Sequence, residues 1–261
     1  MTFPRLAQDV ASARSAVTGL WLLWLLWLCL CTPGTWLACA WAQADTPQPA
    51  ASQSAASQPA TTQPAGPEKL TPATPEFLKD LQDHLREVNS VQADFTQVRQ
   101  LAIFDHTVTI RGRFALQKPD KMIWVVDSPV KYAVSLIGQE LRQWDQDSGK
   151  IQTMDMGGKA EFQSASDQLK AWFLGDYHML TEIFNVSIRQ RQPLTLVFLP
   201  KPDGVAAQFL ERVDLTFAEN GLAIQSVVAR EPGGDVTTIE FTHTQINKPI
   251  KPGAWDLPPH E

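Results

Sequence analysis

Cysteine is scarce in this chain, and its distribution excludes several kinds of site. The three cysteines, Cys29, Cys31 and Cys39, all lie within the first 39 residues. Everything after residue 39 therefore lacks both thiols and disulfides and must fold on its hydrophobic core alone. Cysteine nucleophiles and thiolate metal ligands are excluded for this part of the chain.

The motifs of common enzyme classes are missing as well. The histidines are His84, His106, His178, His243 and His260; none lies four residues from another, and no His-Glu-x-x-His zinc motif occurs. Gly-x-Ser-x-Gly, a phosphate-binding glycine loop and a dinucleotide fingerprint are also absent. The scattered carboxylates give no pair that the sequence places face to face. We expect no catalytic residue, no cofactor and no metal site, and hence a protein that is not an enzyme.

Positive charge is not concentrated in this chain. The formal net charge is −6. Nucleic-acid binding needs clustered lysine and arginine to neutralise phosphates. Mild acidity therefore argues against a nucleic-acid partner.

The first 44 residues have the pattern of an export signal. Two arginines precede an unbroken apolar run, Leu20–Leu30, and Ala42-Gln43-Ala44 is a small-residue cleavage site. We expect cleavage after Ala44 and a mature protein in the periplasm. Two alternatives stay open: an uncleaved anchor, because residues 36–41 are apolar too, or a lipid on Cys39.

The next segment, residues 45–74, consists almost wholly of Ala, Pro, Gln, Ser and Thr. It has no repeating apolar face, so burial could not offset the entropy of ordering it. We expect a disordered linker that is either a tail left by cleavage or a tether. The folded domain is expected over residues 75–261.

Two helices are predicted in this domain. Thr74 is a suitable N-cap and Pro75 a suitable first helical residue. Apolar residues then recur at spacings of three and four, which predicts an amphipathic helix ending near Asn89. A second helix is predicted over residues 164–175, where an apolar cluster follows a serine cap and precedes Gly175.

The remaining apolar residues recur with a period of two, which is typical of antiparallel strands. Turn residues separate ten predicted strands: 107–116, 121–126, 131–137, 140–145, 150–155, 183–190, 193–200, 209–218, 222–230 and 235–244. Such a series indicates a single large antiparallel sheet, a sandwich or a barrel. The helix before the sheet and the helix within it can both close over one mouth of a curved sheet.

Two predicted strands are apolar on both faces. Residues 122–126 (MIWVV) and 194–199 (LTLVFL) depart from the alternation expected when one face is wet. Either they belong to an ordinary sandwich core, or a concave sheet lines an apolar cavity under the helices. The candidate cavity residues are Ile110, Phe114, Met122, Trp124, Val126, Leu136, Trp144 and Phe198, and the candidate lid residues are Trp172 and Phe173.

Three segments after the first helix carry a resemblance to a known family. They are residues 91–97 (VQADFTQ), residues 111–119 (RGRFALQKP) followed by Trp124 and Ser128-Pro129, and residues 137–145 (IGQELRQWD). Their order and spacing over residues 76–156 are similar to those of the LolA family, the periplasmic carriers of outer-membrane lipoproteins.

The resemblance implies a mainly β fold with a helical lid (α+β). This would be an incomplete antiparallel β-barrel or curved sheet of about ten or eleven strands, covered by helices over a hydrophobic cavity. It also implies a monomer that binds the acyl chains of lipoproteins, or another lipid cargo. The cargo would come from an inner-membrane lipoprotein-releasing transporter and pass to an outer-membrane acceptor.

The resemblance also singles out one polar residue. In the family, an arginine before the first proline fastens the lid by hydrogen bonding. Lys118 occupies this position here and is the latch candidate. Lysine is a single-point donor without the planar fork of arginine.

Two other functions stay open. A lipid on Cys39 would make the chain a membrane-tethered, LolB-like acceptor. An envelope assembly adaptor would instead use the sheet edge and no lipid cavity. Uptake of an acyl probe separates the carrier from the adaptor.

Overall fold

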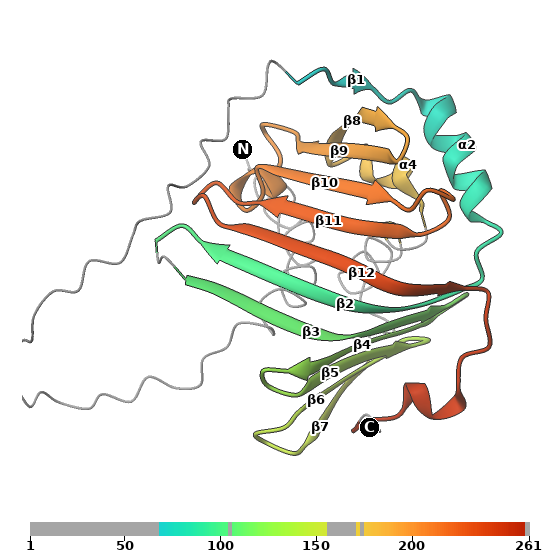
Figure 1. Cartoon of the computed structure of the whole chain (residues 1–261), viewed down its shortest axis with the longest axis vertical. Coiled ribbons are helices and arrows are strands. Elements are labelled where there is room, and N and C mark those ends of the chain that lie inside the picture. Colours follow the sequence, from blue (N-terminus) through green and yellow to red (C-terminus); the bar gives the residue numbers. More distant parts are fainter. Residues whose placement is uncertain (1–67, 104–105, 156–170, 173–174, 259–261) are drawn as a thin grey trace, which may run out of the picture.

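The computed structural model describes residues 68–103, 106–155, 171–172 and 175–258, and in this part of the chain one antiparallel sheet dominates (Figure 1). Its strands follow the order β1-β8-β9-β10-β11-β12-β2-β3-β4-β5-β6-β7, which does not close on itself, so the sheet is an open curved layer. The strands are β1 (Thr71–Pro72), β2 (Ser90–Leu101), β3 (His106–Gln117), β4 (Lys121–Ser128), β5 (Tyr132–Ile137), β6 (Glu140–Asp145), β7 (Ile151–Asp155), β8 (Phe184–Arg191), β9 (Leu194–Pro200), β10 (Arg212–Phe217), β11 (Ile224–Arg230) and β12 (Val236–Ile246). Helices α2 (Pro75–Leu85) and α4 (Tyr177–Leu180) and the 3-10 helices η1 (Val205–Gln208) and η2 (Pro252–Trp255) complete these elements.

The predicted fold class is confirmed, with twelve strands instead of ten or eleven in the described residues. Each of the ten predicted strands is present, with bounds that differ by three residues at most. The largest difference is at β10, which begins at Arg212 because η1 occupies the residues before it. The sequence pattern does not predict β1 and β2.

The missed strand β2 lies near the middle of the sheet and pairs with both β12 and β3 along its length. Its inward-facing positions run Ala93, Phe95, Gln97 and Arg99, since residues of one strand face the same side at every second position. Apolar alternation therefore stops after Phe95, and the period-two signal is lost where the strand continues.

Helix α2 begins where the sequence predicts. The N–H of Phe77 donates to Thr74 Oγ1 at 3.2 Å, which caps the first turn. The helix ends at Leu85, four residues before the expected end, and buries Leu78, Leu81 and Leu85. No helix in the described residues combines the length and the apolar character that crossing a bilayer requires.

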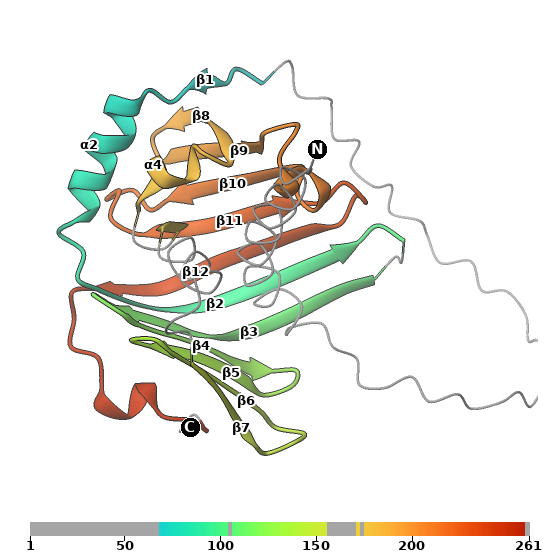
Figure 2. The same ribbon diagram turned by 180° about the vertical axis from the view of Figure 1, so that it is seen from behind.

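The second predicted helix, residues 164–175, falls mostly outside the described residues. Ala171 and Trp172, its described helical residues, are buried in the core cluster under α2. The sequence does not predict the short helix α4 that follows. α4 lies over β9 and β10 in both views of the fold (Figures 1 and 2). Its Tyr177 ring packs 5.9 Å from Phe198 and 6.0 Å from Phe217 between ring centroids.

The chain before α2 runs along the β8 edge of the sheet. β1 pairs with β8 in antiparallel register. Before β1, the Glu68 carboxylate forms an ion pair with Arg189, at 2.9 Å from its Nε, and accepts a hydrogen bond from Arg212 Nη2 at 2.7 Å. The last residues of the segment expected to be a linker, 68–74, are therefore attached to the sheet, and they anchor the N-terminal end of α2.

The centre of the sheet contains a glycine where a backbone carbonyl and a phenylalanine ring leave no room for a side chain. Gly112 on β3 pairs with Phe95 on one side and with Val126 on the other. A Cβ at Gly112 would collide with the Val125 carbonyl oxygen and would lie 2.8 Å from two atoms of the Phe95 ring. The space above Gly112 is thus filled by Phe95, whose ring centroid lies 4.0 Å from that of Trp124.

We expect Gly112→Ala to lower the free energy of unfolding by about 1–3 kcal/mol or more, because overpacking a filled core forces backbone and side chains apart. Gly233→Ala is the matched control, since nothing lies within 4 Å of a Cβ at that glycine. The control should change stability by less than about 1 kcal/mol. Urea unfolding of the two variants measures both values, and equal stabilities would contradict the packing described for Gly112.

Candidate functional site

Six of the predicted cavity residues lie together on one face of the sheet. Alternate residues of β3, β4 and β5 contribute Ile110, Phe114, Met122, Trp124, Val126 and Leu136, which are buried in one cluster with Phe95 and Phe241. The Trp124 ring centroid lies 5.7 Å from that of Phe114 and 6.2 Å from that of Phe241, both in edge-on contact. The inner face of β2–β5 and β12 is therefore an aromatic and aliphatic floor.

The other predicted residues lie elsewhere. Phe198 belongs to the separate core cluster under α2, where its ring centroid is 4.8 Å from that of Trp172. Trp144 is half-buried on the opposite face of the sheet, against the cluster that contains Trp255. Phe173 falls outside the described residues.

The two-sided apolarity of residues 122–126 has a structural explanation. Met122, Trp124 and Val126 lie on the inner face and belong to the floor, whereas Ile123 and Val125 lie on the outer face of the sheet. There the C-terminal segment covers them with Trp255 and Leu257. Both faces of β4 are therefore buried, each by a different part of the chain.

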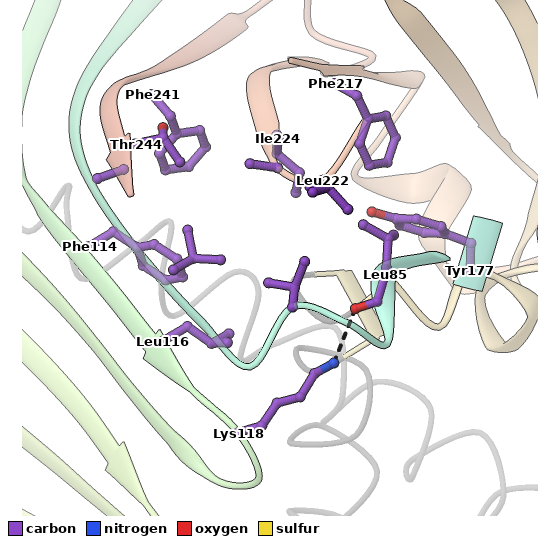
Figure 3. Close-up of a pocket in the computed structure, with 14 residues that line it drawn as sticks. Leu85, Phe114, Leu116, Lys118, Tyr177, Phe217, Leu222, Ile224, Phe241 and Thr244 are labelled. Atoms are coloured by element: carbon purple, nitrogen blue, oxygen red, sulfur yellow. Dashed lines mark hydrogen bonds between the residues drawn. The ribbon is translucent and has the colours of Figure 1, made fainter. Parts of the chain in front are cut away.

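An apolar cavity lies between the floor and the C-terminal end of α2 (Figure 3). Its volume is about 40 Å³, which is room for a few water molecules and not for an acyl chain. The side chains around it in Figure 3 come from α2, α4 and strands β3 and β10–β12 and the turns beside them: Leu85, Phe114, Leu116, Lys118, Tyr177, Phe217, Leu222, Ile224, Phe241 and Thr244.

Lys118 lies at the rim of this cavity and reaches the end of α2. Its Nζ donates to the Leu85 carbonyl oxygen at 3.2 Å and to the Arg86 carbonyl oxygen at 3.4 Å. The last carbonyls of a helix have no partner within it, and the negative end of the helix dipole favours a cation there. Partial burial and the neighbouring Arg86 guanidinium lower the pKa of Lys118.

Asn247, which the sequence analysis does not single out, fastens the connection between α2 and β2. Its Oδ1 accepts from the N–H of Asn89 at 2.6 Å and from the N–H of Ser90 at 3.2 Å. Its Nδ2 donates to the Glu87 carbonyl at 2.8 Å. Asn247 has φ +55°, a left-handed conformation that asparagine adopts more readily than most residues.

Most of the side chains that line the cavity were not among the predicted ones. Phe217 and Phe241 fall in predicted strands, and their alternation marks them as buried. Phe241 contacts Phe114 because β12 pairs with β2. No local sequence pattern predicts that strand order. Leu85 and Tyr177 come from helices, and only the packing of α2 and α4 on the sheet brings them to this cavity.

The site has the chemistry of a binding cavity. Its lining is apolar apart from Lys118, Tyr177 and Thr244. Burial raises the pKa of Tyr177, so this hydroxyl stays neutral, and it donates to the Trp172 carbonyl at 3.4 Å. Across the described residues there is no group of three or more His, Cys, Asp or Glu side chains that could hold a metal ion. An apolar ligand is what such a lining can hold.

Known proteins of similar sequence and one solved structure can be compared with this chain. An outer-membrane lipoprotein carrier protein of Halorhodospira halophila is 26% identical over 188 residues, which cover 70% of this chain and 82% of that protein. The carrier protein of Pseudoalteromonas translucida is 23% identical over 195 residues, covering 72% of this chain and 88% of that protein. A solved LolA superfamily protein of Nitrosomonas europaea aligns with a TM-score of 0.35 and 8% identity over 69% of this chain and 97% of that one.

The family assignment rests on the match that covers most of the folded chain. Residues 86–257 match the family model described as outer membrane lipoprotein carrier protein LolA. These residues are about two thirds of the chain and contain β2–β12, Lys118 and the residues that line the cavity, except Leu85 of α2. The chain therefore belongs to the LolA family of outer-membrane lipoprotein carriers.

Proposed function

We propose that this protein is a periplasmic carrier that binds the acyl chains of lipoproteins between α2 and the inner face of the sheet. In this proposal the first 44 residues direct export and are removed. A monomer then receives its cargo from an inner-membrane transporter and gives it to an outer-membrane acceptor. The observation that carries the proposal is the apolar cavity under the end of α2, closed at its rim by Lys118.

The energetics of the cargo explain why such a cavity is useful. Each acyl methylene that leaves water contributes about 0.8 kcal/mol, so free passage of several acyl chains through water is prohibitively costly. A carrier must bury the chains in an apolar space and still release them without an energy source of its own. Only a difference in affinity between two states of the carrier can drive that release.

In this proposal, the structure represents the carrier with its cavity closed. A cavity of about 40 Å³ does not admit an acyl chain, so binding requires α2 to move away from the floor. The N-terminal end of α2 is anchored by β1 and by the ion pairs of Glu68. At the C-terminal end, opening would break the hydrogen bonds from Lys118 Nζ to Leu85 and Arg86 and the apolar contacts that bury the Leu85 side chain.

Leu222→Glu tests the cavity, because Leu222 is half-buried and lines it (Figure 3). We expect the wild-type protein to bind an environment-sensitive apolar dye and a long-chain acyl ligand to displace the dye. The variant should bind the acyl ligand at least about tenfold more weakly, since burying a carboxylate in an apolar site costs several kcal/mol.

The control is Val130→Glu, which adds the same charge at an exposed position that does not line the cavity. Fluorescence titration of the folded variants gives the affinities. A wild-type protein that takes up no dye, or dye that acyl ligands cannot displace, would refute the carrier function. Equal losses in the two variants would show that the charge does not act in the cavity.

Lys118→Leu tests the latch. The change removes two hydrogen bonds to α2, but it also removes the cost of burying an ammonium group. Because the folded-state pKa of Lys118 is lowered, that cost is present at neutral pH and disappears as the pH rises through the folded pKa toward the unfolded value. We expect global stability to change by less than about 1 kcal/mol and acyl-ligand release to become about tenfold faster.

Two further variants complete the test in stopped-flow release measurements. Lys118→Arg should keep release slow, because a guanidinium can donate to both carbonyls at once. Lys121→Leu loses the same charge three residues away, where the side chain lies over Trp255 on the other face, and should leave release unchanged. Equal rates for wild type, Lys118→Leu and Lys118→Arg would mean that Lys118 is not a latch.

A further inference from the structure

The inner face of the sheet changes from apolar to polar along its strands. On β2 the inward residues run from Phe95 through Gln97 to Arg99. On β12 they run from Phe241 through Ile239 to Thr237, in direct register with β2. The cavity under α2 is at the apolar end, so the polar residues lie at the far end of the same face.

Three polar atoms buried on this face have no hydrogen-bond partner among the described residues. They are Trp124 Nε1, Gln97 Oε1 and Thr237 Oγ1, and each residue is at most 3% exposed. Gln97 and Thr237 are diagonal neighbours on paired strands, since Gln97 pairs with Ile239 and Arg99 pairs with Thr237. Trp124 stacks on Phe95, the inward residue before Gln97. Buried polar atoms are hydrogen-bonded in most proteins, because leaving one unpaired costs about 1–3 kcal/mol.

The charged groups beyond these residues restrict the kind of ligand. Arg99 Nη2 lies 3.0 Å from both Glu231 Oε1 and Asp235 Oδ2, and these side chains are less than a fifth exposed. These three side chains together carry a formal charge of −1. Such a surrounding disfavours an anionic group and accepts a neutral polar one.

From this arrangement we infer that the inner face holds a neutral carbonyl linkage at Gln97, Thr237 and Trp124, so that the cargo is oriented along the strands. The ligand class is an acyl chain joined through a secondary amide, because an ester has no N–H to donate to Gln97 Oε1. Trp124 Nε1 donates to its carbonyl oxygen, Gln97 Oε1 accepts from an amide N–H, and Thr237 Oγ1 serves either group. This inference rests on the proposed carrier function. It adds that the protein recognises the polar linkage at the end of the acyl chain.

The test compares three ligands with one chain length: N-methyldodecanamide, dodecane and dodecanoate. Each displaces an apolar dye from wild-type protein, Gln97→Leu or Thr237→Val, and the isosteric Thr237→Val decides if Gln97→Leu does not fold. We expect either variant to bind the amide about fivefold to tenfold more weakly than wild type does, with the affinity for dodecane unchanged. Wild type should bind dodecanoate more weakly than the amide.

Ser135→Ala is the matched control. Ser135 is fully buried and its Oγ is also without a partner among the described residues, but it pairs with Ile123 on the opposite face of the sheet. This variant should bind all three ligands as wild type does. Unchanged amide affinity in both test variants, or dodecanoate bound more tightly than the amide, would overturn the carbonyl site and leave the carrier function standing. If no ligand displaced dye from wild type, the carrier function itself would be wrong, and this inference with it.

Discussion

The backbone carbonyls of residues 85–87, at the end of α2 and just beyond it, receive hydrogen bonds from two distant places in the chain. Lys118 donates to the carbonyls of Leu85 and Arg86, and Asn247 donates to that of Glu87. Leu85 is also a wall of the cavity, and a Cβ at Gly175 would collide with its side chain. The position of this one helical turn therefore determines how much space remains above the floor of the sheet.

The contacts that hold the sheet together are different from those that hold the end of α2 over the cavity. The floor is fixed by strand pairing and by the contacts of Trp124 with Phe95, Phe114 and Phe241. The helix is anchored at its other end by β1 and Glu68. In the proposed opening, the hydrogen bonds of Lys118 and the apolar contacts of Leu85 break while the strand pairing of the sheet is kept, as a carrier that binds and releases its cargo requires.

Local patterns in the sequence predict helix caps and strand alternation, which depend on neighbouring residues. They do not predict which strands pair or which face of the sheet a residue lies on. The cap of α2 follows from Thr74 and Pro75, and the alternation of β3 and β4 predicts the floor residues Phe114 and Trp124. Trp144 has the same apolar character as Trp124. It lies on the other face because Ala133, its partner on β5, alternates with Val134, the partner of Trp124.

Local sequence patterns miss β2 and Asn247 for two different physical reasons. β2 lacks apolar alternation because its inner face ends in Gln97 and Arg99, the same residues that give the inner face its polar end. Asn247 closes hydrogen bonds to residues more than 150 positions away, and no local pattern reports such a contact. Lys118 could be singled out only through the resemblance to the family, which supplied a role that its charge alone does not suggest.

In the proposed carrier, acyl chains occupy the inner face of the sheet beneath α2. Photocrosslinking with an acyl chain that carries a diazirine near its end, followed by residue-level mass spectrometry, tests this placement of the acyl chains. We expect adducts on cavity residues such as Phe114, Leu222 and Phe241, and their loss when an excess of unlabelled acyl ligand is present. Adducts confined to the opposite face, at Trp144 and Trp255, would contradict it.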